Sequence, residues 1–448
     1  MEEPFSPETG TITAPQRRSL LTRARSFFVG DAGIWAILIA LMFGSIAVVF
    51  SAVSQEAFQA EARGGLFYGE FLQHLALIVV SFIMVSVMSR ISTKFYQQLS
   101  FYFLLFCIIL LVYTLVAGAE LNEGKRWIRL FGFTIQPSEI SKVAVINYVA
   151  FSLWKDEGRK SLNTFIRTWW PVLTVILLIV FENISTAAFI FLITLVTTIV
   201  GGISKRYSGY LLMGAVAAGL VLVMFKLFAP DAEGVGRSET GHNRIMRFAT
   251  KLFKPINEET YDDIMGMDYQ VVMAQKAIAN SNLIGKGAGR SELRQWLPAA
   301  YSDYIYNVVV EEYGIFGSLF ILITYVIFFW RCGKLANQSR SNYKSTLLYG
   351  IGITITGQAV MNMMVATNLL PVTGQTLPFI SKGGSSYIFM SMFFGLALAV
   401  SREIQASRRR QEAEASGIDG MPEVDLERIP DFEKEAEEET IPGNHTSI

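Results

Sequence analysis

The sequence predicts an all-α, polytopic membrane protein with a large extracytoplasmic loop between its seventh and eighth transmembrane helices. Of its 448 residues, 52% are hydrophobic and 17% are charged, whereas soluble domains carry about 25% charged residues. The mean hydropathy is +0.38. Apolar runs recur along the chain, and a bilayer core requires about 20 apolar residues per helix. Composition and periodic apolar runs together therefore predict about ten membrane-spanning helices.

The apolar runs define the expected spans and their orientation. They cover roughly 33–54, 72–89, 98–118, 139–154, 169–182, 184–202, 207–229, 306–331, 345–369 and 385–402. Short cytoplasmic loops are enriched in Lys and Arg, and an even number of spans places most basic loop residues on one side. We therefore expect both termini in the cytoplasm. The basic segment 119–138 falls on the opposite side, which suggests a functional site or a segment lying on the membrane.

Three regions follow from this pattern. Residues 1–31 form a cytoplasmic N-terminal tail, and residues 32–403 form the membrane domain. Its outer loop, 230–305, is too long to be a simple connection. In the tail, 404–448, the residues from 411 onward include twelve acidic side chains and only two basic ones. Such a composition predicts a disordered cytoplasmic tail, although a binding segment for a cytoplasmic protein is an alternative.

Several function classes are disfavoured. The two cysteines and three histidines lie far apart in unlike surroundings, so neither a disulfide framework, a histidine metal site nor a Ser-His-Asp triad is expected. The 38 basic and 38 acidic residues balance, but unevenly along the chain, so the net charge says nothing about nucleic-acid binding. We expect the membrane to be a partner, and no nucleic acid. No clustered acidic site requires a metal.

Asp303 is the best single candidate for chemistry. It closes a polar stretch and opens an apolar span, and Asn307 and Glu311 follow at intervals of four residues. On a helix these three side chains project from one face. A polar stripe entering lipid is costly unless it lines a cavity or meets partners. The alternative is that Asp303 caps the helix N-terminus, with Glu311 or Glu312 pairing with a buried cation.

A second group of polar residues surrounds a predicted helix start. Pro137 suits the first helical turn, and Glu139 favours the positive end of the helix dipole. Glu139 and Lys142 are spaced to pair on one face. One interpretation is a helix cap with an interfacial tryptophan anchor, and the other is a cationic pocket for an anionic head group. The residues of this group are Trp127, Arg129, Gln136, Ser138, Glu139 and Lys142.

Two further segments lie in the outer loop. Arg244, Arg247, Lys251 and Lys254 share one face of an amphipathic stretch, 243–254. The basic side chains of that face either extend toward anionic lipid head groups or bind a phosphate. A second amphipathic piece, 268–280, carries Gln270 and Gln275 and precedes the glycine cluster 285–289. This cluster follows no predicted strand, so tight turns explain it better than a nucleotide-binding loop.

The last motif is the loop 368–386 between two spans, which contains two prolines and three glycines before Ser385 and Ser386. We expect a rigid, non-helical backbone there. Such a backbone at membrane depth must be buried in protein or line a cavity.

Taken together, these stretches resemble the SEDS family of FtsW and RodA proteins, over about residues 30–403. The sequence motif Thr376-Leu377-Pro378-Phe379-Ile380 is more similar to FtsW than to RodA. Departures occur at Asn183, at 299–301 and at Lys382, but the aspartate at 303 is kept. The matching motifs are Trp127 to Gly132, Gln136 to Glu139 with Lys142, Arg244 and Arg247 before Pro255, Tyr269-Gln270, Gly285 to Gly287, Asp303 before Glu311-Glu312 and Gly314, and Leu377 to Ser386.

The resemblance implies an inverting glycosyltransferase of the bacterial inner membrane that polymerises lipid II, an undecaprenyl-pyrophosphoryl disaccharide-pentapeptide, for septal cell-wall synthesis. Asp303 would be the base, and Lys142, Arg244 and Arg247 would hold the pyrophosphate, where Mg²⁺ or Mn²⁺ is an optional aid. Asn307, Glu311 and Glu312 would support the site. A class B penicillin-binding protein and other division proteins would be partners. The remaining substrate-binding residues implied are Trp127, Arg129, Gln136, Ser138, Glu139, Gln270, Gln275, Ser385 and Ser386.

Three alternatives stay open. An elongation-type, RodA-like polymerase would have the same chemistry. A lipid II flippase would use the same cationic residues, but a transporter places its ionisable groups near the bilayer midplane, and here they gather on the outer side. A non-catalytic scaffold of the division machinery would tolerate the loss of Asp303.

Overall fold

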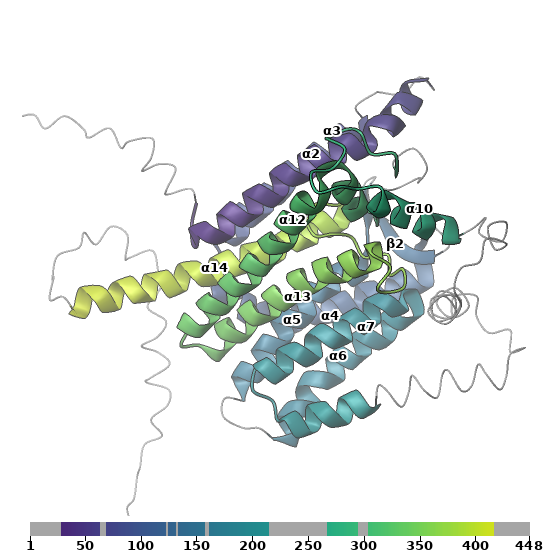
Figure 1. Ribbon diagram of the computed structural model, residues 1–448. Coiled ribbons are helices and arrows are strands. Elements are labelled where there is room, and N and C mark those ends of the chain that lie inside the picture. The colour runs from purple at the N-terminus through teal and green to yellow at the C-terminus, as the bar shows by residue number, and fades with distance from the viewer. Residues whose placement is uncertain are drawn as a thin grey trace, which may run out of the picture. The chain divides into compact units, whose positions relative to one another are not determined.

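The computed structural model describes residues 28–62, 69–121, 124–130, 133–156, 161–214, 267–293 and 303–415. The chain divides into two units, Met1–Ile404 and Gln405–Ile448. The first unit holds a helical bundle (Figure 1). Its main helices are α2 (Ala32–Ala62), α3 (Gly69–Met88), α4 (Thr93–Ala117), α5 (Pro137–Lys155), α6 (Leu162–Glu182), α7 (Ile184–Val200), α10 (Met267–Ala279), α12 (Ile305–Gln338), α13 (Asn342–Ala366) and α14 (Gly384–Ala415).

The all-α prediction is confirmed, and the number of spans stays a prediction. Within the described ranges, seven helices are long and apolar enough to cross a membrane, namely α2, α3, α4, α6, α12, α13 and α14. Helix α7 is apolar but shorter. The expected span 207–229 is described only as far as residue 214, with helix from 205. Most of the loop 230–305 lies outside the described residues, including the basic stretch 243–254.

Helix α5 lies at the centre of the bundle because both of its sides are covered. Val143, Ile146 and Ala150 join the apolar core built mainly from α2, α12, α13 and α14. Val145 and Val149 join a second core, built with α4, α6 and α7. Nearly every residue of α5 is consequently buried. A helix covered in this way can carry polar side chains inside the bundle if they find partners there.

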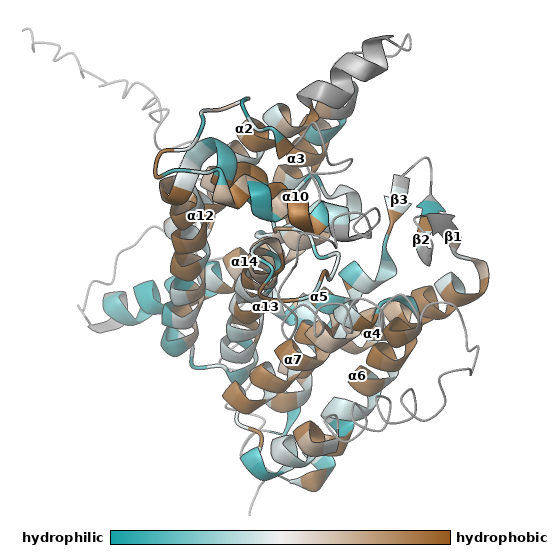
Figure 2. Cartoon of the chain, turned by 45° about the vertical axis from the view of Figure 1, so that its right-hand side comes forward, coloured by the Kyte–Doolittle hydropathy of each residue, from teal (hydrophilic) through white to brown (hydrophobic). Residues whose placement is uncertain are grey.

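The outer sides of several helices are apolar and exposed, as expected for lipid contact. Tyr102 on α4, Trp170 on α6, and Phe316 and Phe320 on α12 are among the most exposed of these side chains. Figure 2 shows the hydrophobic colouring concentrated along α4, α6, α7 and α12. The burial pattern therefore agrees with the membrane assignment that composition predicted.

A small antiparallel sheet, which the sequence analysis did not predict, follows α4. Strands β1 (Ala119–Leu121), β2 (Gly124–Leu130) and β3 (Phe133–Ile135) have the order β1-β2-β3. Trp127 pairs with Ala119, and Ile128 pairs with Ile135. Two of these strands have three residues each, too few for a two-residue alternation to stand out in the sequence.

Helix α12 breaks at Gly314, where φ is +66° and ψ is −161°. The break leaves two carbonyl groups without helical donors. The loop before α12 supplies the missing donors, because Lys286 N donates to Glu311 O and Gly287 N to Glu312 O, each at 2.9 Å. Gly285 also has a positive φ, +84°. The glycine cluster 285–289 thus forms turns, as predicted, and docks on the broken helix.

Helix α14 continues to Ala415, past the boundary at 403 that the sequence predicted for the start of the tail. The helix therefore includes the first part of the segment expected to be disordered. The acidic residues after 415 lie outside the described residues.

Candidate functional site

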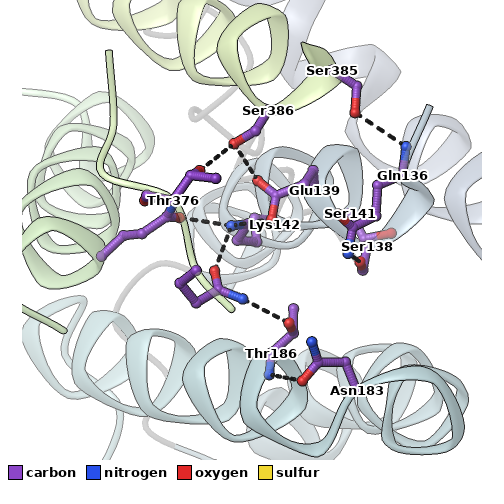
Figure 3. Close-up of polar contacts among 12 residues, drawn as sticks. Gln136, Ser138, Glu139, Ser141, Lys142, Asn183, Thr186, Thr376, Ser385 and Ser386 are labelled. Carbon is purple, nitrogen blue, oxygen red and sulfur yellow. Dashed lines mark hydrogen bonds and ion pairs between the residues drawn. The ribbon is translucent and has the colours of Figure 1, made fainter. Parts of the chain in front are cut away.

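Lys142 is the centre of a polar network inside the bundle. Its side chain is fully buried on the second turn of α5. The ammonium group contacts Glu139 Oε1 at 2.8 Å, Gln358 Oε1 at 2.7 Å and Gln375 Oε1 at 3.3 Å (Figure 3). An ammonium group has three N–H donors, so these contacts use all of them. The predicted pairing of Glu139 with Lys142 is confirmed, and it lies inside the protein.

The other carboxylate oxygen of Glu139 connects α5 to α14. Ser386 Oγ donates to Glu139 Oε2 at 3.0 Å and lies 3.1 Å from Thr376 Oγ1. The neighbouring Ser385 Oγ accepts from the backbone N–H of Gln136 at 3.2 Å. Figure 3 shows these contacts around the first turns of both helices. The network therefore joins two of the motifs that the sequence analysis singled out.

Gln136 and Ser138 mark the start of α5. Pro137 occupies its first turn, as predicted, and Gln136 is the N-cap residue without capping through its side chain. Its amide donates instead to Ser138 Oγ at 3.1 Å. Ser138 is buried and Gln136 is half-buried. Both residues thus stand beside the Glu139–Lys142 pair without contacting the lysine.

The segment between α13 and α14 is non-helical, as predicted. Hydrogen bonds with side chains of the bundle hold it in position. Gln375 Nε2 donates to Thr186 Oγ1 at 2.7 Å, and Gln358 Nε2 donates to Thr376 O at 3.0 Å. Tyr325 donates its hydroxyl hydrogen to Pro378 O. A buried backbone without helical bonds needs such partners. The loop therefore belongs to the packed interior near Lys142.

Asp303 is half-buried and lies two residues before α12. The N-cap residue is Tyr304, whose side chain makes no capping hydrogen bond, so Asp303 stands one residue before the N-cap position that the alternative assigned to it. The Asp303 carbonyl oxygen accepts from Asn362 Nδ2 at 3.1 Å. The same amide donates to Gln375 O at 2.7 Å. Asn362 thus connects Asp303 to the residue that contacts Lys142.

Asn307, Glu311 and Glu312 occupy the same helix and are buried. Asn307 Nδ2 donates to Ala274 O and Ala366 O. Glu311 accepts from Lys286 Nζ at 2.8 Å and from Ser291 Oγ at 2.6 Å. Because Lys286 is a cation, the expectation that one of the two glutamates pairs with a cation is confirmed for Glu311, although the cation is partly exposed.

Glu312 also accepts a hydrogen bond from the loop 286–293. It accepts from the backbone N–H of Ser291 at 3.3 Å and from the Ser51 hydroxyl. Glu311 also accepts the N–H groups of Glu292 and Leu293. The two adjacent glutamates therefore anchor residues 286–293 to α12 and α2, which leaves their support of Asp303 a prediction.

The remaining predicted residues are spread over other elements. Trp127 is half-buried and Arg129 is exposed on β2. Gln270 is exposed and Gln275 is half-buried on α10, the helix expected over 268–280. None of these four contacts Lys142 or Asp303 through a hydrogen bond recorded among the described residues. Arg244 and Arg247 lie outside the described residues.

Three network residues escaped the sequence analysis, namely Thr186, Gln358 and Asn362. Gln375 and Thr376 were inside a recognised loop, but their side chains were not singled out. A signal for two of them existed: Gln358 and Asn362 are polar residues, four positions apart, within the apolar α13. A polar stripe within a span indicates buried partners, and the same argument was applied only to α12.

The polar groups described above gather at one end of the bundle. Glu139 and Lys142 lie in the first two turns of α5, Asn307 and Glu311 near the start of α12, and Asn362 near the end of α13. In the part of the chain that the structure describes, no three His, Cys, Asp or Glu side chains cluster in a way that could hold a metal ion. The site therefore offers a carboxylate, a buried cation and amide groups.

These features define a class: a polytopic, helical membrane protein with a polar centre at one end of its bundle. The chain belongs to the FtsW, RodA and SpoVE family, because the family model described as a cell cycle protein matches residues 31–406. The resemblance to FtsW and RodA is thus confirmed.

Relatives and solved structures are similar over most of the chain. A protein of Geobacter sulfurreducens named "Probable peptidoglycan glycosyltransferase FtsW" is 28% identical over 384 residues, covering 84% of this chain and 96% of that protein. One of the same name from Escherichia coli O6:H1 is 29% identical, covering 74% and 77%.

Two solved structures share the fold. A chain from a peptidoglycan synthase complex that coordinates polymerization and crosslinking matches with a TM-score of 0.66, at 21% identity, covering 84% of this chain and 98% of that one. The rod shape determining protein RodA of Thermus thermophilus matches with a TM-score of 0.59, at 20% identity, with the same coverage.

Proposed function

We propose that this protein is an inverting peptidoglycan glycosyltransferase that polymerises lipid II, with Asp303 as the general base. The observation that carries the proposal is the short connection between the backbone of Asp303, a half-buried residue, and a buried cation. Asn362 donates to the carbonyl oxygens of Asp303 and Gln375, and the Gln375 side chain accepts from Lys142. Membership of a family whose curated relatives are named peptidoglycan glycosyltransferases supports it.

The reaction joins two lipid-linked sugars. The 4-hydroxyl oxygen of the acceptor attacks the anomeric carbon of the donor, and the bond from that carbon to the pyrophosphate oxygen breaks. Asp303 takes the hydroxyl proton, and undecaprenyl pyrophosphate leaves with the bonding electrons. The configuration inverts to a β-1,4 linkage. A base near the hydroxyl and positive charge near the leaving group lower the barrier.

The position of Asp303 suits an amphiphilic substrate. It lies at the point where a membrane-length helix begins, with polar segments on one side and apolar helix surfaces on the other. A sugar head group then meets the carboxylate while the polyprenyl chain stays against apolar surfaces. This arrangement favours a lipid-linked sugar over a free nucleotide sugar.

The basic residues are proposed to serve the leaving group. Arg244 and Arg247 would provide bidentate donors for a pyrophosphate. Lys142 would reach it only by exchanging one of its three acceptors, and Gln375, at 3.3 Å, is the most distant. Without such an exchange, Lys142 would act by holding the loop around Gln375. Trp127, Arg129, Gln270 and Gln275 would contact the substrate further from the reacting atoms.

The biological setting follows from the FtsW-named relatives. We propose septal synthesis at the bacterial inner membrane, with both termini in the cytoplasm and a class B penicillin-binding protein as the crosslinking partner. The match to a chain of a peptidoglycan synthase complex supports a partner of this kind. The exposed apolar face of α12 after Gly314 would be the docking surface for this partner.

Purified full-length protein in vesicles tests the proposal directly. Wild-type protein with lipid II should form glycan chains on a gel, and Asp303→Asn should form none while keeping its expression and unfolding temperature. A translocation assay with labelled lipid II in the same vesicles addresses the flippase alternative. Glycan chains from the Asp303→Asn protein would rule out the base assignment, and translocation without polymerisation would favour the flippase.

A further inference from the structure

Two buried asparagines clamp α12 and α13 together in a reciprocal way. Asn307 on α12 donates from Nδ2 to Ala366 O at 3.0 Å, and Asn362 on α13 donates from Nδ2 to Asp303 O at 3.1 Å. Ala366 lies four residues after Asn362, and Asp303 lies four residues before Asn307. Each amide therefore reaches the carbonyl one turn away from the other asparagine.

The second hydrogen of each amide goes to a different segment. Asn362 Nδ2 donates to Gln375 O at 2.7 Å, whereas Asn307 Nδ2 donates to Ala274 O on α10 at 2.9 Å. An amide group has two donor hydrogens, so both side chains use their full donor capacity. Asn362 thereby holds the loop after α13, and Asn307 holds α10.

The backbone carbonyl groups of Asp303, Ala366 and Gln375 all require a hydrogen-bond donor from a side chain. Ala366 is the last residue of α13, Asp303 precedes α12, and Gln375 lies in a non-helical loop. Helix ends and irregular segments leave carbonyl groups without intrahelical donors. When such groups are buried, a side chain must supply the donor. Asn362 supplies two of these donors while itself 1% exposed.

The hydrogen bonds of Asn362, unlike those of Asn307, connect Asp303 to the residue that contacts Lys142. Gln375 accepts from Lys142 through Oε1 and donates to Thr186. The path from Asp303 to Lys142 therefore passes through one amide and one glutamine. A shift of the Asn362 side chain would move the backbone of Asp303 relative to the buried cation, without touching either charged group.

We propose that Asn362 is a positioning residue that fixes Asp303 relative to the Gln375 loop and, through it, to Lys142. This inference rests on the proposed function, in which Asp303 is the base. Its role is to hold the carboxylate at a set distance from the loop while lipid II binds. A small displacement of a catalytic group is sufficient to cost about 100-fold in rate.

The test compares Asn362→Ala with Asn147→Ala in full-length protein in vesicles. Asn147 is a matched control, since it is buried, donates from Nδ2 to Tyr96 O at 2.9 Å and accepts from the Tyr343 hydroxyl at 2.6 Å. It contacts neither Asp303 nor Gln375. Rates are measured at saturating lipid II, and concentrations are scaled to the folded fraction. Asn362→Ser, which keeps one hydroxyl donor, is the second variant if Asn362→Ala fails to fold.

We expect Asn362→Ala to lower kcat by about 10- to 100-fold while KM for lipid II changes less than about twofold. Asn147→Ala should lower the unfolding temperature but keep kcat within about twofold. Equal kcat losses in the two variants, an unchanged kcat in Asn362→Ala, or an effect on KM alone would overturn the inference. Polymerisation by Asp303→Asn would instead overturn the base assignment, so the two failures are distinguishable.

Discussion

Glu139 and Lys142 form an ion pair at 2.8 Å, and neither side chain is more than 6% exposed. The two residues stand three positions apart on α5, the helix enclosed by both apolar cores. A buried pair of charges is tolerated when each group is also hydrogen-bonded. Ser386 provides that bond for Glu139, and Gln358 provides it for Lys142.

Removing one partner of this pair should be costly. Lys142→Met leaves the Glu139 carboxylate buried without its cation, and breaking a buried pair costs about 3–5 kcal/mol. Thermal unfolding in detergent should therefore show a clearly lower transition temperature. Adding Glu139→Gln removes the uncompensated charge and should recover part of the loss. A double variant less stable than Lys142→Met alone would contradict this account.

The break in α12 requires glycine at position 314. A Cβ there would lie 2.4 Å from Leu283 O and 2.5 Å from the backbone nitrogen of Gly285, and neither backbone atom can move freely. Gly314→Ala should therefore release the loop 282–287 from the helix as well as strain the backbone. Limited proteolysis of that loop, together with thermal unfolding, measures both effects.

Gly289→Ala is the matched control for Gly314→Ala. Gly289 also has a positive φ, +78°, but a Cβ there meets nothing within 4 Å. Its substitution should cost only the left-handed backbone penalty, about 1–2 kcal/mol, without releasing the loop. Equal proteolysis of both variants would show that the close approach at Gly314 is unimportant.

The attachment of residues 286–293 should depend on pH. Hydrogen bonding to Glu311 raises the pKa of Lys286 above its usual 10.5. Because the folded-state pKa is the higher one, the stabilisation is fully present below the unfolded pKa, and it is lost as pH rises through the folded pKa. Protease sensitivity of this loop should therefore increase above about pH 10.5.

Lys286→Met is the control for this pH dependence. It lacks the titrating group, so its loop should be more sensitive at neutral pH and should show no further change of this origin at alkaline pH. The side chain of Lys286 is 23% exposed and that of Glu311 only 1%, so added salt should weaken the attachment only in part. An identical alkaline increase in protease sensitivity in Lys286→Met would show that a group other than Lys286 titrates there.

The bidentate contact between Arg331 and Asp31 should make the stability of the protein sensitive to the replacement of Arg331 by lysine. Arg331 donates from Nε and one terminal nitrogen to the two oxygens of Asp31, both at 2.8 Å. The backbone N–H of Asp31 donates to Ser401 Oγ at 2.9 Å. Arg331→Lys keeps the charge but loses one of two charge-assisted bonds, each worth about 1.5–3 kcal/mol. Its unfolding temperature should fall.

Arg408→Lys is the corresponding surface control. Arg408 pairs with Glu412 at 3.5 Å, and both side chains are more than half exposed. Exposed ion pairs contribute little to stability, so this variant should unfold at the wild-type temperature. A similar decrease in both variants would indicate a general effect of replacing arginine.

Local sequence signals predicted the elements that depend on near neighbours. Pro137 and Glu139 indicated the start of α5, the glycines at 285–289 indicated turns, and the apolar periodicity over 268–280 indicated α10. Each of these features depends on backbone preferences or on side chains within one helical turn. The same reasoning misplaced the cap at Asp303, because the helix begins at Ile305, one residue later than a cap at 303 requires.

The network around Lys142 could not be predicted in the same way. Gln358 lies 216 positions from Lys142, and Gln375 lies 233 positions away. The polar residues of α13 indicate buried partners, but nothing local shows which partners they are, or distinguishes an amide with two buried acceptors from one facing a water-filled space. Only the packing of α5, α7 and α13 determines which amides meet which carbonyl groups.

The sequence by itself determined the membrane class, the helical fold and the family, and it selected Asp303 as the candidate base, because hydropathy and motif order are properties of the chain. Tertiary structure alone decided that Glu139 and Lys142 form a closed pair, that Glu311 and Glu312 anchor a loop, and that Asn362 connects Asp303 to that pair through Gln375. The physical reason is that buried polar groups must find donors and acceptors wherever folding brings them.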